Sequence, residues 1–154
     1  MRKRLPLVGF TLIALAVLVA AITAFGGEAL ADDPSLATPA EADLSGGAVV
    51  PTQGDPDGTG HIDMLLYPSK NKICYRITVA GIESATAAHL HRGTAGEVGP
   101  AVLRLRVPRE TVRECRRELG KRFIREIKHN TSDYYVDVHN AGFPDGALRG
   151  QLTR

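Results

Sequence analysis

Short segments with alternating apolar and polar residues make up most of the chain after its first 40 residues. This alternation is typical of β-strands, whose successive side chains point to opposite faces. Residues rich in Gly, Pro, Asn and Asp separate the segments. The pattern predicts strands at residues 41–50, 60–67, 72–80, 86–92, 101–107, 134–139 and 147–153.

About seven to eight short strands joined by tight turns predict an all-β fold, an antiparallel sandwich or barrel. The turn sequence Pro68-Ser69-Lys70-Asn71 predicts a hairpin over residues 60–80.

Residues 109–130 interrupt the strand pattern. Leu119, Phe123, Ile124 and Ile127 recur at helical spacing. Gly120 disfavours one continuous helix, so we expect two short helical pieces. Such a helical crossover is long for a β domain and is expected to cover a sheet face or the rim of a site.

The first 31 residues have the pattern of an export signal. A basic start, Arg2-Lys3-Arg4, precedes an apolar run over residues 5–25 and a small-residue cleavage pattern at Ala29-Leu30-Ala31. The alternative is an uncleaved membrane anchor, because the run approaches the roughly 20 residues that span a bilayer. We expect a signal peptide at 1–31, a flexible leader at 32–40, a single domain at 41–154, and secretion to an extracellular or periplasmic location.

Basic residues are concentrated in one part of the chain. Residues 32–154 carry equal numbers of acidic and basic side chains, which gives no support to nucleic-acid binding. Residues 104–128, however, contain ten Lys or Arg and four Glu. A solvated helix face with i, i+4 pairs such as Glu118 and Arg122 explains this. The alternative is adhesion to an acidic surface through Arg113, Arg116, Arg117, Lys121 and Arg122.

Cys74 and Cys115 are the only cysteines. In an exported protein such a pair tends to form a disulfide, which we expect here. A soft metal site would need more ligands than these two.

Alternation also predicts a polar cluster from three strands. Leu90, Val136, Val138 and Leu148 take the core face, so their neighbours take the other face. If the three strands are adjacent, the cluster lies on the outer face of the sheet beneath the crossover. Its predicted members are His89, His91, Asp137, His139, Arg149 and Gln151.

Two interpretations of this cluster stay open. His89, His91 and His139 are a ligand set suited to copper or zinc, with Asp137 orienting a ligand. Alternatively, Asp137 and Arg149 form a hydrogen-bond network through the histidines. No nucleophile elbow and no acid-base pair of carboxylates is recognisable, so we expect no catalytic residues and no enzymatic activity.

Several motifs resemble the chordin-domain (CHRD) family: Ala88-His89-Leu90-His91-Arg92-Gly93, Tyr134-Tyr135-Val136-Asp137-Val138-His139 and Gly150-Gln151-Leu152. The resemblance implies a secreted module with an immunoglobulin-like barrel, distantly similar to copper-zinc superoxide dismutases. We expect a binding or structural role, with an unknown extracellular protein or polysaccharide as partner.

The dismutase similarity would place the three histidines where those enzymes hold copper. His61 and His129 lack the pattern of a bridging ligand or a second metal site, so dismutase-like redox activity is only a weak alternative.

Overall fold

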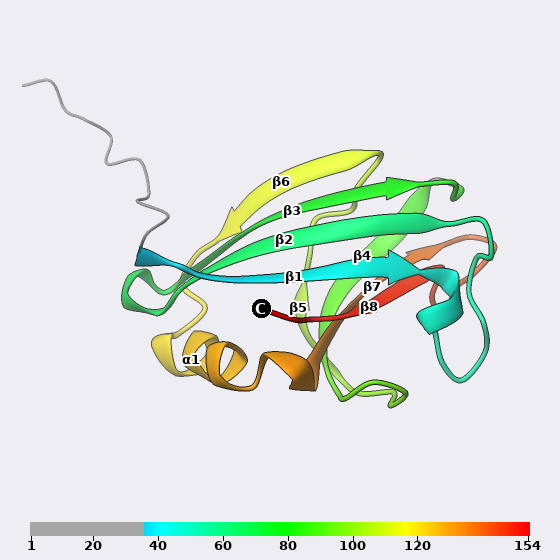
Figure 1. The fold of residues 1–154 in the computed structure, drawn as a ribbon. Coiled ribbons are helices and arrows are strands. Elements are labelled where there is room, and N and C mark those ends of the chain that lie inside the picture. Colours follow the sequence, from blue (N-terminus) through cyan, green and yellow to red (C-terminus); the bar gives the residue numbers. More distant parts are fainter. Residues whose placement is uncertain (1–35) are drawn as a thin grey trace, which may run out of the picture. The chain divides into compact units, whose positions relative to one another are not determined.

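The computed structural model describes residues 36–154. Their eight strands form one antiparallel sheet in the order β5-β4-β7-β8-β1-β2-β3-β6. The sheet curls into two layers, one built from β6, β3, β2 and β1 and the other from β8, β7, β4 and β5 (Figure 1). The strands are β1 (Thr38–Ser45), β2 (Thr59–Tyr67), β3 (Lys72–Ala80), β4 (Ala85–Arg92), β5 (Ala101–Arg104), β6 (Thr111–Arg116), β7 (Tyr134–Asn140) and β8 (Leu148–Gln151).

The space between the layers is filled by the apolar side chains that alternate along the strands. Ile62, Ile77, Leu90 and Val136 are fully buried there, as expected when one face of each strand covers a core. Every residue of this buried core lies between Ala40 and Leu152. These residues all lie within the compact unit Asp32–Arg154.

Each of the seven predicted strands corresponds to a strand in the structure, and the all-β antiparallel fold is confirmed. The β2–β3 hairpin turns at η3 (Pro68–Lys70), as predicted. Strand β1 begins earlier than expected, because Thr38–Ala40 of the predicted leader pair with β2. The predicted signal peptide and residues 32–35 lie outside the described residues.

The crossover differs from the prediction in its first half. Residues 111–116 form β6, which pairs with β3 and places Cys115 directly opposite Cys74. The two cysteines form the predicted disulfide. Sheet pairing and this bond hold a segment that has only two β-formers, Thr111 and Val112, in an extended conformation.

The second half of the crossover is helix α1 (Lys121–His129), which buries Ile124 and Ile127. It packs at the end of the sheet where the η3 turn lies (Figure 1). Glu118 has a positive φ of 60° and lies before the helix begins. The predicted i, i+4 pair of Glu118 and Arg122 on a helix face was therefore wrong. Among the described residues, α1 and the short η turns are the helices, and none has the length and apolarity to cross a membrane.

Candidate metal centre

Strands β4, β7 and β8 are neighbours, as the predicted cluster required. Their register places His89 opposite Asp137, and Asp137 opposite Arg149. Tyr135 lies between His91 and Gln151 in the next row. The six predicted cluster residues therefore share one face of three adjacent strands.

Loops cover this face, so several of its polar residues are buried. Asp137 is 7 % exposed and Arg149 is 4 % exposed. A small pocket of about 200 Å³ lies above them, roofed by side chains from three loops. These roof residues are Val49, Val50, Val98, Pro144 and Asp145.

The predicted cover was wrong, because the crossover does not line this pocket. Strand β6 pairs with β3 at the opposite edge of the sheet from β5 and β4. The roof comes instead from the loops that follow β1, β4 and β7.

The His91 and His139 imidazoles and the Asp137 carboxylate line the pocket floor, and a third imidazole, that of His89, lies beside them. His91 Nε2 lies 2.9 Å and His139 Nε2 lies 3.1 Å from Asp137 Oδ2. His89 Nδ1 lies 3.3 Å from His139 Nε2. One ligand atom from each of these four residues lies within 4.8 Å of the other three. This is close enough for one metal ion to contact all four after small side-chain movements, since metal–ligand bonds are about 2.0–2.2 Å long.

Backbone carbonyls fix two of the rings. The Nδ1 atom of His91 donates to the Gly99 carbonyl at 2.8 Å, and the Nδ1 atom of His139 donates to the Pro144 carbonyl at 2.9 Å. A carbonyl only accepts, so in each neutral ring the proton resides on Nδ1 and Nε2 presents a lone pair. Both lone pairs then face the same Asp137 oxygen.

Neutral imidazoles and a carboxylate arranged in this way repel one another. His91 Nε2 and Asp137 Oδ1 are buried and form no hydrogen bond with acceptable geometry within the described residues. Buried polar atoms normally have partners, and leaving one without costs stability. The arrangement is favourable when protons or a metal cation lie between these atoms.

The pKa values of the four residues reflect both their burial and their contacts with one another. Burial acts to raise the pKa of Asp137, but the close contacts of its carboxylate with the His139 and His91 rings, which are favourable when the rings are protonated, hold it well below its usual range. The same contact with Asp137 raises the pKa of His139. In His91, burial lowers the pKa, yet Asp137 and the Gly99 carbonyl raise it overall. Burial lowers the pKa of His89.

Arg149 and Gln151 bind backbone carbonyls of the loop that follows β4. Arg149 Nη2 donates to the Thr94 carbonyl at 3.1 Å, and its guanidinium lies 3.5 Å from the centre of the Tyr135 ring. Gln151 Nε2 donates to the Gly93 carbonyl at 2.9 Å. These contacts fasten the loop that carries Gly99 and thereby position His91.

Sequence reasoning missed three contributors to the site. Tyr135 stacks on His91 with ring centres 4.7 Å apart. Gly99 and Pro144 supply the carbonyls that orient two histidines. The position of Tyr135 beside Asp137 on the polar face was readable from alternation, but the approach of a particular loop carbonyl has no signature in the sequence.

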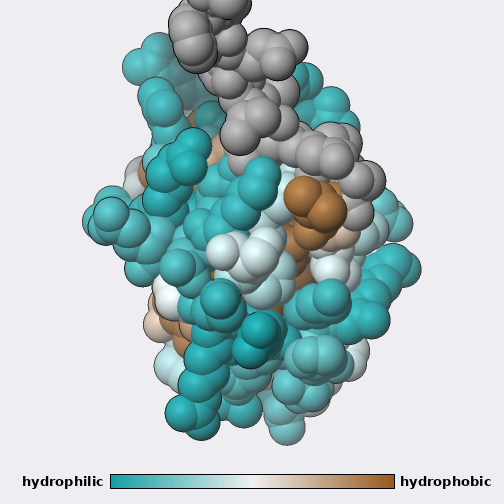
Figure 2. Space-filling view, turned by 90° about the vertical axis from the view of Figure 1, so that its left-hand side faces the viewer, coloured by the Kyte–Doolittle hydropathy of each residue, from teal (hydrophilic) through white to brown (hydrophobic). Residues whose placement is uncertain are grey.

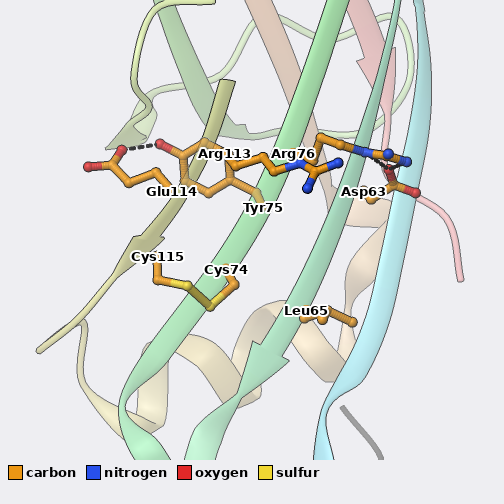
Figure 3. A pocket seen from close by; sticks show the side chains of 8 residues that line it. All are labelled: Asp63, Leu65, Cys74, Tyr75, Arg76, Arg113, Glu114 and Cys115. Atoms are coloured by element: carbon orange, nitrogen blue, oxygen red, sulfur yellow. Dashed lines mark hydrogen bonds and ion pairs between the residues drawn. A yellow bond between two sulfur atoms is a disulfide. The ribbon is translucent and has the colours of Figure 1, made fainter. Parts of the chain in front are cut away.

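A groove of about 440 Å³ lies on the outer face of β2, β3 and β6. Figure 3 shows the disulfide and Leu65 among its lining, with the paired Asp63 and Arg76 to one side. It shares no residue with the pocket above the histidines.

A second group of potential ligands, Glu41, His61 and Asp63, lies on β1 and β2. His61 binds Asp43 at 2.8 Å, and Asp63 binds Arg76 at 2.7 Å. His61 and Asp63 therefore already have charged partners on neighbouring strands.

Taken together, the structure defines a disulfide-bonded antiparallel β domain with a roofed histidine–aspartate cluster on one outer face. The CHRD-domain family model matches residues 40–152, which is nearly all of the described chain. The chain therefore belongs to the CHRD-domain family. Searches of curated proteins and of solved structures found no match.

Proposed function

We propose that this CHRD domain is an exported, non-enzymatic binding module whose site holds one copper(II) or zinc ion. The observation that carries the proposal is the convergence of His89, His91, His139 and Asp137 within 4.8 Å. Export rests on the signal-like pattern of the first 31 residues and on the disulfide, which is typical of oxidising compartments.

The donor set favours these two ions. Imidazole nitrogens suit zinc and copper, and a single carboxylate is compatible with either. Both cysteines are joined in the disulfide, away from the cluster, so no thiolate is present to favour a softer ion. Calcium and magnesium prefer oxygen ligands and fit poorly.

The surroundings of the ligands also support the proposal. Metal-binding histidines commonly donate their second ring nitrogen to a carbonyl or carboxylate, which fixes the tautomer. The Gly99 and Pro144 carbonyls hold His91 and His139 in that form. Little rearrangement of these two rings is then needed on binding.

Titration calorimetry of the Asp32–Arg154 unit with Cu²⁺ and Zn²⁺ tests the proposal. One ion is expected to bind per chain. His89→Ala and His139→Ala are each expected to weaken binding roughly tenfold or more, as loss of a ligand should.

His129→Ala is the matched control. It also removes one histidine, but His129 lies on α1 outside the cluster and its loss should leave the affinity unchanged. Equal and weak uptake by the parent and all three variants would overturn the proposal and leave the cluster as an ionic network within a structural module.

A further inference from the structure

Helix α1 presents a basic face at one end of the domain. Lys121, Arg125 and Lys128 recur at intervals of four and three residues, so they share one side of the helix. They line a cleft of about 300 Å³ between the helix and the η3 turn. None of the described residues that line this cleft is acidic.

The only acidic residue of α1 is engaged elsewhere. Glu126 pairs with Arg92 at 3.0 Å. No acidic side chain within residues 36–154 forms an ion pair with Lys121, Arg125 or Lys128. Within residues 36–154, the charge of the basic face is therefore uncompensated by ion pairs.

This charge arrangement opposes helix stability. Lys121 and Arg122 occupy the first turn, which contains no acidic residue and where the helix dipole disfavours cations. Lys121 and Arg125 are also like charges at i, i+4. The helix dipole favours Lys128 in the last turn, but the helix gains nothing from the charges of Lys121 and Arg125, and binding of an anion explains them.

An exposed apolar side chain lies in the same cleft. Leu36 lines it and is 60 % exposed. Figure 2 shows this end of the domain, where hydrophilic side chains cover most of the surface and hydrophobic surface appears only in small patches. Basic residues next to an exposed apolar group are typical of surfaces that bind membrane interfaces.

We propose that this end of the domain, formed by the basic face of α1 and Leu36, docks on a membrane surface rich in anionic phospholipids. The cationic side chains would contact lipid phosphates, and Leu36 would enter the headgroup region. The proposal is independent of metal binding, because the cleft and the histidine pocket share no residue.

The sequence before the domain favours a membrane over another polyanion. The apolar run of residues 5–25 is separated from Leu36 by only ten residues, which extend to at most about 36 Å. If this run stays in the bilayer, Leu36 and the basic cleft are the part of the domain held nearest to it. If the run is removed, the same surface still provides a reversible electrostatic contact.

Vesicle co-sedimentation of the Asp32–Arg154 unit tests the docking without any contribution from the apolar run. Vesicles of phosphatidylcholine alone are compared with vesicles that also contain phosphatidylglycerol, at low and high salt. We expect binding only to the anionic vesicles, with loss at high salt.

The decisive variant is the triple reversal K121E/R125E/K128E. Each basic residue near an anionic surface is worth about fivefold in affinity, so the triple variant should bind at least about 100-fold more weakly. Leu36→Ser should weaken binding by a smaller factor. The control R106E/R109E/R113E changes the net charge equally, uses exposed residues outside the cleft and should bind more tightly than the triple variant.

Circular dichroism first confirms that each variant folds, and K121Q/R125Q/K128Q replaces the reversal if it does not. Equal loss in both triple variants would show that net charge alone acts and would overturn the proposal. Retention on an anionic polysaccharide such as heparin without vesicle binding would overturn it in favour of a glycan. Absence of binding to either would also overturn it.

Discussion

His91 and His139 approach the same oxygen of Asp137 from two different strands. His91 Nε2 lies 2.9 Å and His139 Nε2 lies 3.1 Å from Asp137 Oδ2. Since backbone carbonyls accept the Nδ1 protons of both rings, neither Nε2 can donate to Asp137 while the ring is neutral. The cluster is therefore stabilised either by added protons or by a metal cation, and these two states compete.

The metal-free domain should consequently be more stable at mildly acidic pH than at alkaline pH. The raised pKa values of His91 and His139 mean that their contribution is complete below their usual pKa of 6.5 and is lost as the pH rises through the folded values. The lowered pKa of Asp137 adds stability that is present above 3.8 and is lost as the pH falls towards its folded value. His89, with a lowered pKa, opposes the first trend in part.

Denaturant unfolding in the presence of a chelator, at about pH 5.5 and about pH 8.5, measures this dependence. Asp137→Asn removes the charge that favours the protonated rings, so its stability should change less between the two pH values. A parent domain with greater stability at the alkaline pH would contradict this prediction.

Gly99→Ala should weaken metal binding although Gly99 is not a ligand. A Cβ atom at this position would overlap the carbonyl carbon and oxygen of Arg92, so the backbone must shift. That shift moves the carbonyl that orients His91. Loss of an orienting partner typically costs 10- to 100-fold in metal affinity, and we expect roughly tenfold.

Gly47→Ala is the matched control for this prediction, because a Cβ atom there would meet nothing within 4 Å. Calorimetric titration of both variants with Zn²⁺ measures the difference. Unchanged affinity in Gly99→Ala would mean that the Gly99 carbonyl does not position the ring.

The strands and the faces of their side chains were predictable because both follow from local alternation. Leu90 and Val136 are buried, and His89, His91 and His139 lie on the opposite face, as the period of two requires. The antiparallel fold then brought the histidines together, because β4 and β7 are direct neighbours.

The roof of the site and strand β6 were not predictable in this way. Residues 111–116 have charged residues at three of six positions, and only pairing with β3 makes them a strand. Cys115 was the one available signal, since a bond to Cys74 within a predicted strand favours an adjacent extended segment. The loop carbonyls of Gly99 and Pro144 depend on tertiary packing, which leaves no local pattern.

Removal of the disulfide should destabilise the domain and loosen its β6 edge. Cys74 and Cys115 are separated by 41 residues, for which the loss of chain entropy predicts about 4 kcal/mol, with typical measured values of about 2–4 kcal/mol. Denaturant unfolding of the Cys74→Ala/Cys115→Ala variant measures the change. Hydrogen exchange should accelerate most in residues 111–116, because β6 lies at the edge of the sheet and, among the described strands, pairs only with β3.

The metal affinity of that variant should be close to that of the parent, since the disulfide and the histidine pocket share no residues. A large loss of Zn²⁺ binding in a variant that remains folded would show that β6 and the histidine cluster are coupled through the sheet.

Leu90→Ala should separate fold stability from metal binding. Leu90 is fully buried and lies between two proposed ligands, but its side chain points into the core, opposite Val136 and Leu103. Truncation of a buried leucine costs about 2–5 kcal/mol through lost burial and the resulting cavity. The imidazoles of His89 and His91 face the other way and keep their partners.

The free energy of unfolding of the metal-free Leu90→Ala variant should therefore fall by about 3 kcal/mol, while its Zn²⁺ affinity changes little. Zinc at 100 times its dissociation constant stabilises a folded protein by about 2.7 kcal/mol, so the ion should restore most of the lost stability. Denaturant unfolding with zinc and with chelator measures both quantities, and failure of zinc to stabilise a folded Leu90→Ala variant would mean that the core side of β4 also determines the geometry of the metal site.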